Sequence, residues 1–282
     1  QADPTCDRSD EDAPFSLMAH QEVVREYISQ FTPYRGILLF HGLGSGKTCS
    51  SIAIAEGIKT HKEVLVLTPA SLRTNYIEEL KKCGDELYKK NQFWEFVSTV
   101  DNADMMRTLS NVLGIAPEFI RKQGGAWLMN MKKAPNFEDL ASSEKKTLDK
   151  QIDAMIENKY TFWSYNGMRQ AHLDNITRNN TINPFDNKVV IIDEAHNFVS
   201  RIVNKLNKHD TLSSKLYEFL MNAKQCKIVL LSGTPIINYP NEIGIMFNIL
   251  RGKIRSWSLK LTVHESKKVS DEFLQSIFKS AT

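Results

Sequence analysis

The chain has 282 residues, of which 41% are hydrophobic and 24% charged, and its formal net charge at pH 7 is +3. This composition is typical of a folded globular protein with one large or two small domains, and it excludes wholesale disorder. No apolar run approaches the roughly 18–20 residues that span a bilayer, and no cationic start precedes an apolar stretch. We therefore expect a soluble protein that is neither secreted nor bound to a membrane.

The charge is distributed unevenly between the two ends of the chain. Residues 1–30 carry seven acids and two bases, a balance of −5, whereas residues 251–282 carry seven bases and three acids, a balance of +4. A basic segment can contact phosphates, but a solvated surface has the same composition. Charge alone therefore does not identify a partner.

The four cysteines, Cys6, Cys49, Cys83 and Cys226, are widely separated in the sequence and include no CxxC pair. This spacing is typical neither of a disulfide framework nor of a zinc site. We therefore expect a protein of a reducing, intracellular compartment that has no structural disulfides.

Along the chain, segments with strand-like and helix-like patterns alternate. Residues 1–14 are acidic and polar and are predicted to be a flexible tail, after which apolar residues at helical spacing predict an amphipathic helix over 16–30, capped by Ser16 and ended by Pro33. Strands are expected at 36–40, 64–67, 188–192 and 227–231, weaker strands at 93–97 and 160–163, and helices at 47–59 and 71–82. The strands are nearly continuous Val/Ile/Leu runs between helices, which predicts an α/β fold with a mostly parallel sheet covered on both faces.

Residues 99–158 interrupt this alternation. The stretch is long and rich in Met and Lys, and Leu148, Ile152, Met155 and Ile156 recur at helical spacing. We interpret it as a largely helical insertion that emerges from one edge of the sheet. Loops of this length are uncommon without a function, so we expect it to serve partners or nucleic acid and not to build the main site.

A glycine-rich loop, HGLGSGKT at 41–48, follows the first strand directly and opens a helix. Its three glycines allow successive backbone N–H groups to surround a polyphosphate, and the helix N-terminus adds a positive dipole end. Lys47 is then expected to reach the β- and γ-phosphates, and the Thr48 hydroxyl to hold Mg²⁺. His41 stands where the strict motif has glycine, and a strand-to-helix turn that needs only flexibility is the alternative.

Two further polar groups follow predicted strands. Asp193 and Glu194 come at the carboxyl end of the strand at 188–192, where ligands bind in open α/β sheets. Asp193 is expected to hold Mg²⁺, and Glu194 to orient and deprotonate the attacking water, although acids in this position also cap helices. Ser232 and Thr234, after the strand at 227–231, are expected to sense the γ-phosphate unless they form only a turn.

Together, these motifs resemble those of superfamily 2 helicases and translocases. The resemblance includes GxGKT, the DEAH sequence at 193–196, SGTP at 232–235, the upstream glutamine Gln21 and the TPASL segment at 68–72. Its details, such as LLFHGLGSGKTCSSIAIAEG and VVIIDEAHNF, are similar to the Swi/Snf-like group of large DNA viruses. This group includes poxvirus-type nucleoside triphosphate phosphohydrolase I and the small subunit of the viral early transcription factor. A histidine before the loop is normal there, and the match covers residues 15–250.

The resemblance implies a first RecA-like domain over 15–250 that uses ATP and Mg²⁺ and acts on DNA or RNA. It implies that Glu194, Lys47 and Asp193 are catalytic and that Thr48 and Asp193 bind the metal. The implied nucleotide-binding residues are Gln21, which reads adenine, and Gly42, Leu43, Gly44, Ser45, Gly46, Lys47, Thr48 and Cys49. The resemblance further implies that His196, Ser232 and Thr234 couple hydrolysis to movement, and that Thr68, Pro69 and Arg73 touch nucleic acid. For Arg73, an ordinary exposed helix charge is the alternative.

Residues 251–282 depart from the family pattern, because they contain no further strand–helix series and no arginine motif. We interpret them as the start of an accessory segment and the chain as the N-terminal half of a larger motor. A second RecA-like domain would supply the arginine fingers, and the fragment would be a monomer. Viral RNA polymerase or transcription factor subunits are expected partners, and the virion and host cytoplasm the expected location.

Two other functions remain open. The first is a transcription-factor scaffold subunit whose nucleotide site mainly supports contacts with RNA polymerase and promoter DNA. That function would fit loss of the lysine or the water-activating acid, yet Lys47 and Glu194 are both present. The second is a phosphate-loop enzyme unrelated to nucleic acid, such as a small-molecule kinase, and the SGTP and TPAS segments argue against it.

Overall fold

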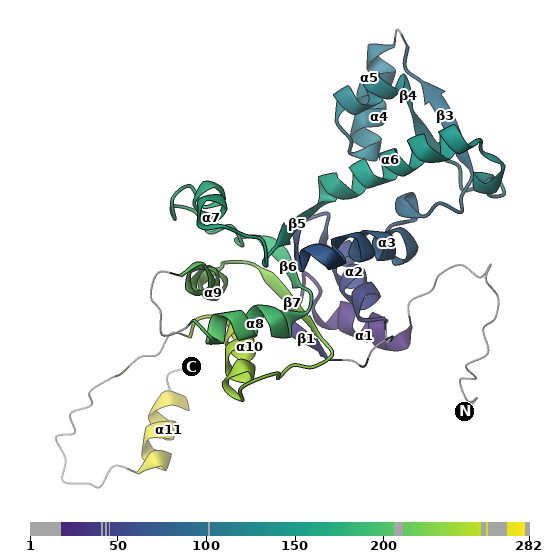
Figure 1. Cartoon of the computed structure of the whole chain (residues 1–282). Coiled ribbons are helices and arrows are strands. Elements are labelled where there is room, and N and C mark those ends of the chain that lie inside the picture. The colour runs from purple at the N-terminus through teal and green to yellow at the C-terminus, as the bar shows by residue number, and fades with distance from the viewer. Residues whose placement is uncertain are drawn as a thin grey trace, which may run out of the picture.

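At the centre of the molecule is a five-stranded parallel sheet (Figure 1). The computed structural model describes residues 18–40, 42, 44, 46–100, 102–205, 211–254, 258 and 270–279. The strands, in the spatial order β1-β7-β6-β2-β5, are β1 (Gly36–Phe40), β7 (Lys227–Ser232), β6 (Lys188–Ile192), β2 (Glu63–Thr68) and β5 (Tyr160–Ser164). The predicted α/β class with a mostly parallel sheet is therefore confirmed. The predicted tail at 1–14 and the cap Ser16 lie outside the described residues.

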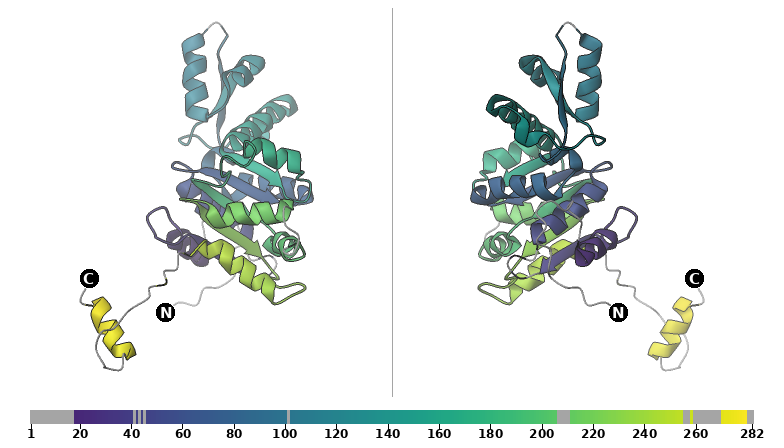
Figure 2. Two further views of the ribbon diagram at one scale, coloured as in Figure 1. Left: turned by 90° about the vertical axis from the view of Figure 1, so that its left-hand side faces the viewer. Right: turned by 90° about the vertical axis from the view of Figure 1, so that its right-hand side faces the viewer.

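Helices cover both faces of this sheet, as Figure 2 shows from two sides. One face packs against α2 (Lys47–Ile58) and α3 (Arg73–Cys83), and the other against α8 (Ala195–Val203), α9 (Leu212–Asn222) and α10 (Asn241–Arg251). Successive side chains of a strand point to opposite faces, so Val189 and Ile191 enter the first core whereas Val190 and Ile192 enter the second. Two buried faces explain why the strands read as unbroken apolar runs.

The register of the sheet aligns the carboxyl ends of its central strands. Phe40 of β1 lies opposite Ser232 of β7, and Ile192 of β6 lies between Leu67 of β2 and Leu230 of β7. The glycine-rich loop, the acidic pair and the SGTP segment therefore all follow strands at one edge of the sheet.

The insertion is a compact layer of helices and strands, and Figure 1 shows it projecting beyond β5. It begins earlier than the predicted residue 99, at the strand expected over 93–97, and contains β3 (Trp94–Ser98), α4 (Ala103–Leu113), α5 (Pro117–Gln123), β4 (Gly125–Met129) and α6 (Ser142–Lys159). Residues 99–158 are largely helical, as predicted, but the separate antiparallel sheet that β3 and β4 form was not predicted. A five-residue apolar run such as β4 has no period that identifies a strand. The predicted face of α6, from Leu148 to Ile156, is buried as expected.

The first helix, α1 (Ala19–Tyr27), is shorter than predicted. Within it, Gln21 is buried, whereas Val23 is 66% exposed, and Phe31 just beyond the helix is 90% exposed. The predicted apolar face is therefore buried only in part, because Ile28 is fully buried and Val24 packs against the core. Its contact with α2 also places a polar side chain at the glycine-rich loop.

The remaining described elements are short. They are the 3₁₀ turns η1 (Ala70–Leu72), η2 (Glu86–Tyr88) and η3 (Phe137–Asp139) and the helices α7 (Gln170–Ile176) and α11 (Asp271–Lys279). Among the described residues, no helix combines the length and apolarity needed to cross a bilayer.

Candidate functional site

A pocket of about 430 Å³ opens at the carboxyl edge of the sheet, between the glycine-rich loop and α3. The sequence-predicted residues that line it are Gly44, Gly46, Lys47, Thr48, Asp193 and Glu194. The other lining residues are Leu72, Asn75, Tyr76 and Glu79, and sequence reasoning missed all four. Counted from Leu72, the other three follow after three, four and seven residues, which is the spacing of one helix face. The sequence shows this spacing, but it does not show that this face lines the pocket.

The glycine-rich loop has the backbone geometry that its composition predicts. Gly44 (φ 77°) and Gly46 (φ 73°) adopt left-handed conformations, which glycine accepts without steric cost. A Cβ on Gly46 would lie 2.7 Å from Nε2 of Gln21, so no larger residue fits there without a shift. Lys47 Nζ donates to the carbonyl of Gly42 at 2.9 Å across the loop. His41 and the predicted nucleotide-binding residues Leu43 and Ser45 lie outside the described residues.

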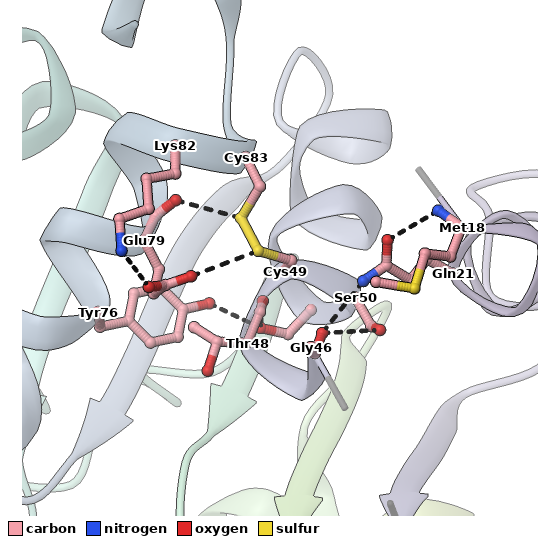
Figure 3. Close-up of a disulfide and its surroundings, with 11 residues drawn as sticks. Met18, Gln21, Gly46, Thr48, Cys49, Ser50, Tyr76, Glu79, Lys82 and Cys83 are labelled. Carbon is pink, nitrogen blue, oxygen red and sulfur yellow. Dashed lines mark hydrogen bonds and ion pairs between the residues drawn. A yellow bond between two sulfur atoms is a disulfide. The ribbon is translucent and has the colours of Figure 1, made fainter. Parts of the chain in front are cut away.

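Gln21 connects α1 to this loop, as Figure 3 shows. Its Oε1 accepts from the backbone N–H of Met18 at 3.0 Å, which satisfies one of the free amides at the helix start. Its Nε2 donates to the carbonyl of Gly46 at 3.3 Å. The structure thus places Gln21 at the loop, as expected, while its contact with adenine stays a prediction.

Asp193 extends the sheet and points its carboxylate into the pocket. Its backbone N–H donates to Leu67 O at 2.8 Å, and its carboxylate accepts from the Thr68 hydroxyl at 3.2 Å and the Glu194 N–H at 3.0 Å. Burial and the nearby Glu194 charge raise the pKa of Asp193, although these hydrogen bonds and Lys47 oppose the shift. A carboxylate and the Thr48 hydroxyl are oxygen ligands of the kind Mg²⁺ prefers. The residues present therefore fit a magnesium ion.

His196 links the acidic segment, which carries Glu194, to the SGTP segment, which carries Ser232. Glu194 Oε2 lies 3.4 Å from His196 Nε2, and His196 Nδ1 lies 3.0 Å from Ser232 Oγ. Ser232 Oγ also accepts from the backbone N–H of Thr234 at 3.1 Å. The structure therefore brings the predicted water-activating acid and all three predicted coupling residues into one connected group.

The turn that carries the acidic pair has an unfavourable backbone. Glu194 has φ 48°, a left-handed conformation that is uncommon outside glycine and costs free energy. The hydroxyl of buried Tyr165 donates to the carbonyls of Asp193 and Glu194, at 3.2 and 3.3 Å, and supports this conformation. Burial, together with these two acids, raises the pKa of Tyr165 and keeps it a donor. Strain of this kind is frequent at functional sites.

A second, wider pocket of about 720 Å³ adjoins the first and shares Leu72 and Glu194 with it. Pro69 lines it, as does Arg201, which donates to Tyr165 O at 2.9 Å and Asn166 Oδ1 at 2.7 Å. Pro69 is thus the predicted nucleic-acid residue that opens onto a surface pocket.

The other two predicted nucleic-acid residues have different surroundings. The Thr68 side chain is buried and donates a hydrogen bond to Asp193, and its contact with nucleic acid stays a prediction. Arg73 is half-exposed; it pairs with Glu157 of α6 at 3.3 Å, and its guanidinium lies 5.4 Å from the ring centre of Phe162. These surroundings fit the alternative of an ordinary helix charge, and the contact of Arg73 with nucleic acid stays a prediction.

Sequence reasoning also missed a buried carboxylate behind the SGTP segment. Glu242 is fully buried, and it accepts from the backbone N–H groups of Ile237 and Asn238 at 2.7 and 3.2 Å. Burial raises the pKa of Glu242, but these hydrogen bonds, together with those of the Ser200 and Asn238 side chains, outweigh it and hold the pKa below its ordinary value. The Asn238 amide donates onward to Ser200 of α8 at 2.8 Å. This network fixes the loop after SGTP to the helix that follows the acidic pair.

The cysteine prediction is wrong for one pair. Cys49 and Cys83 are joined by a disulfide, with a Cα–Cα distance of 5.7 Å that is usual for such bonds (Figure 3). The two are 34 residues apart in the sequence, but the start of α2 packs against the end of α3. Cys49 is not among the residues that line the pocket, and its predicted part in nucleotide binding stays a prediction. Cys226 is buried and free, and Cys6 lies outside the described residues.

Comparison with known proteins gives one consistent result. The model of the SNF2-related domain matches residues 20–262. The chain is 30% identical over 238 residues to a protein of Acanthamoeba polyphaga mimivirus named as a candidate ATP-dependent RNA helicase, covering 84% of this chain and 33% of that protein. It is 26% identical over 227 residues to a termination factor NPH-I homolog of African swine fever virus, covering 80% and 24%.

Among solved structures, the chain is similar to the Sulfolobus solfataricus SWI2/SNF2 ATPase core in complex with dsDNA. The TM-score is 0.43 at 19% identity, and the alignment covers 84% of this chain and 36% of that one. The chain spans about a third or less of the length of the curated relatives named above.

Proposed function

The chain belongs to the family of SNF2-related domains, and on that premise we propose that it is the N-terminal ATP-binding motor domain of a viral nucleic-acid-dependent ATPase. In this proposal, the glycine-rich loop binds the phosphates of ATP, and the DEAH segment holds Mg²⁺ and activates water. The observation that carries it is the single pocket that contains Lys47, Thr48, Asp193 and Glu194.

Each of these residues has a separate part in the proposed reaction. Lys47 and the positive end of α2 neutralise the phosphates, while Thr48 and Asp193 hold the metal. A bound Mg²⁺ would offset the charge of the β- and γ-phosphates. Glu194 accepts a proton from the attacking water, and His196 connects it to Ser232. Loss of the γ-phosphate would then be relayed to the SGTP loop.

The partners and location belong to the proposal as well. The resemblance to superfamily 2 motors and the pocket beside Pro69 support DNA or RNA as a partner. The similarity to a protein named as a termination factor homolog favours a role in transcription, with viral RNA polymerase or transcription factor subunits as partners. The virion and the host cytoplasm are the compartments that we propose for such a protein.

The isolated chain is proposed to be a slow enzyme. Among the described residues that line the pocket, Lys47 is the one with a positive charge. An arginine supplied across the cleft contributes about 10³–10⁵ to turnover in phosphoryl transfer, so a second RecA-like domain would complete the site. Full activity would then require a longer protein than these 282 residues.

The test is phosphate release from Mg·ATP by the 282-residue chain, alone and with single-stranded DNA, duplex DNA or RNA. We expect slow, Mg²⁺-dependent release that nucleic acid stimulates little. A chain that releases no phosphate under any of these conditions contradicts the proposed enzyme. If such a chain still bound nucleotide, the scaffold function, in which the site mainly supports polymerase contacts, would be favoured instead.

A further inference from the structure

The disulfide joins the two walls of the proposed nucleotide pocket. Cys49 is the third residue of α2 and follows Lys47 and Thr48 directly, whereas Cys83 is the last residue of α3. No other disulfide joins the described residues, and both cysteines are buried, at 9% and 5% exposed. The bond therefore ties the phosphate-binding end of α2 to the helix opposite.

The face of α3 that carries Cys83 also lines the pocket. Glu79, one turn before Cys83, lines the pocket with one carboxylate oxygen 3.5 Å from Cys49 Sγ. Tyr76, one turn earlier, shares a hydrogen bond of 2.9 Å with Ser51 of α2 (Figure 3 shows Tyr76, Glu79 and Cys83 together). The disulfide therefore holds the segment of α3 that carries Glu79 and Tyr76 against α2.

A second pocket, which shares no lining residue with the nucleotide pocket, extends to Cys83. Cys83 lines a separate pocket of about 380 Å³, together with Gly84, Asp85 and Ala53. A small thiol that enters this pocket reaches Cys83 without passing the glycine-rich loop. The disulfide thus lies between two pockets, the proposed nucleotide pocket and the pocket lined by Cys83.

We propose that Cys49 and Cys83 form a reversible thiol–disulfide site that sets the nucleotide affinity of the adjacent pocket, with a low-molecular-weight thiol as the reductant. This inference rests on the proposed function, because it assigns a regulator to the same pocket. The disulfide restrains α3 against the start of α2 and so preorganises the wall that Glu79 and Tyr76 form. A preorganised site loses less conformational entropy on binding, so the disulfide form binds nucleotide more tightly.

The exchange conserves atoms and electrons. A thiolate of the reductant attacks Cys83 Sγ, forms a mixed disulfide there and releases Cys49 as a thiolate that takes up a proton. A second reductant thiol then displaces Cys83, and the reductant leaves as its own disulfide. Two protons and two electrons pass to the protein. The new thiols have acceptors at hand, since Glu79 Oε2 lies 3.5 Å from Cys49 Sγ and Glu79 O lies 3.1 Å from Cys83 Sγ.

The coupling must act in both directions. If the disulfide tightens nucleotide binding by some factor, nucleotide stabilises the disulfide against reduction by the same factor. We expect about a fivefold effect, at the low end of usual coupling between two sites. The low end is expected because the bond restrains the wall of the pocket and does not touch the loop itself.

The experiment measures redox state and affinity in the same samples. The chain is equilibrated in glutathione buffers, alkylated and digested, so that the cross-linked Cys49–Cys83 peptide is counted by mass spectrometry. Affinity is measured in parallel with a fluorescent ATP analogue and Mg²⁺. The Cys83→Ser variant removes the disulfide, and Cys226→Ala is the matched control that keeps it. Counting the peptide in the unaltered chain shows the disulfide even if a variant folds poorly.

We expect the dissociation constant to be about fivefold lower in the oxidised chain than in the reduced chain. Cys83→Ser should bind with the weaker affinity in every buffer, whereas Cys226→Ala should keep the redox difference. Saturating nucleotide should move the midpoint toward more reducing buffers by the same factor. Absence of the cross-linked peptide in oxidising buffer, or equal affinities in both states, would overturn the proposal.

Two other outcomes identify different failures. Cysteine, glutamate and cysteine ligand atoms here lie within 4.8 Å of one another, so the reduced chain is also titrated with Zn²⁺. Stoichiometric zinc on Cys49, Glu79 and Cys83 that blocks re-oxidation would replace the thiol–disulfide site with a metal site. A chain that forms the cross-linked peptide but binds no nucleotide in either state would refute the proposed function, and the regulation with it.

Discussion

The carboxyl edge of the main sheet and the insertion differ in how they treat polar groups. At the sheet edge, Glu194 has a strained backbone and burial raises the pKa of Asp193. In the insertion, the amide of buried Gln151 accepts from Trp127 N and donates to Trp127 O, both at 2.8 Å, and so completes the outer side of β4. Backbone strain and a buried carboxylate with a raised pKa are typical of a functional site. By contrast, the hydrogen bonds between Gln151 and Trp127 are made to backbone groups that would otherwise be unpaired, and they stabilise the fold.

The largest expected effect is on ATP turnover, which should depend on the sheet edge and not on the insertion. Glu194→Gln removes the proposed proton acceptor but keeps the shape of the turn, so turnover should fall by about 10²–10⁴ while nucleotide affinity is kept. The measurement is single-turnover phosphate release beside nucleotide binding. Glu118→Gln, an exposed change in the insertion, is the control and should leave both unchanged. Equal turnover in Glu194→Gln and the unaltered chain would remove the acid from the mechanism.

The second effect is on the free energy of unfolding, which should depend on the paired polar group of the insertion. Gln151→Leu leaves the buried N–H and C=O of Trp127 without partners, so the free energy of unfolding should fall by about 2–4 kcal/mol. Denaturant unfolding measures this loss, and Lys150→Ala, an exposed change on the same helix, should cost little. Nucleotide affinity of the folded variant should be unchanged. A weaker affinity would show that the insertion contributes to the pocket.

A smaller effect tests the connection within the site. Ser232→Ala removes the hydroxyl that joins His196 to the Thr234 N–H. Loss of one such hydrogen bond corresponds to about tenfold in turnover, with affinity for Mg·ATP unchanged. Ser71→Ala, an exposed hydroxyl at the neighbouring pocket, is the comparison. A Ser232→Ala variant with full turnover would mean that the hydroxyl serves only the turn.

The smallest effect concerns stability at the site. Because the pKa of Asp193 is higher in the folded state than in the unfolded state, its charge destabilises the fold at neutral pH. Stability should therefore rise as the pH falls through the range between the unfolded and folded pKa values. Asp193→Asn should raise Tm slightly and remove this dependence, while Asp104→Asn, at an exposed acid, should not. A lower Tm for Asp193→Asn would show that the carboxylate stabilises the fold.

The sequence predicted the sheet edge far better than the insertion. The five sheet strands, the loop after β1 and the acids after β6 follow from apolar runs ending in polar motifs, because parallel strands align their carboxyl ends. By contrast, β4 is too short to show a period, and the pairing of Gln151 with Trp127 depends on a contact 24 residues away. The Cys49–Cys83 bond and the pocket face of α3 likewise depend on how helices pack, and the contact of buried Thr68 is with Asp193, 125 residues away in the sequence.

The central claim is that the glycine-rich loop binds ATP, and nucleotide titration tests it most directly. A fluorescent ATP analogue with Mg²⁺ is titrated into the unaltered chain, Lys47→Ala and the exposed control Lys150→Ala. We predict one site per chain, a loss of at least about tenfold in affinity for Lys47→Ala and no loss for Lys150→Ala, because a hydrogen bond to a charged group is lost in the first variant alone. Equal affinity in all three proteins would contradict the claim that this pocket holds the nucleotide.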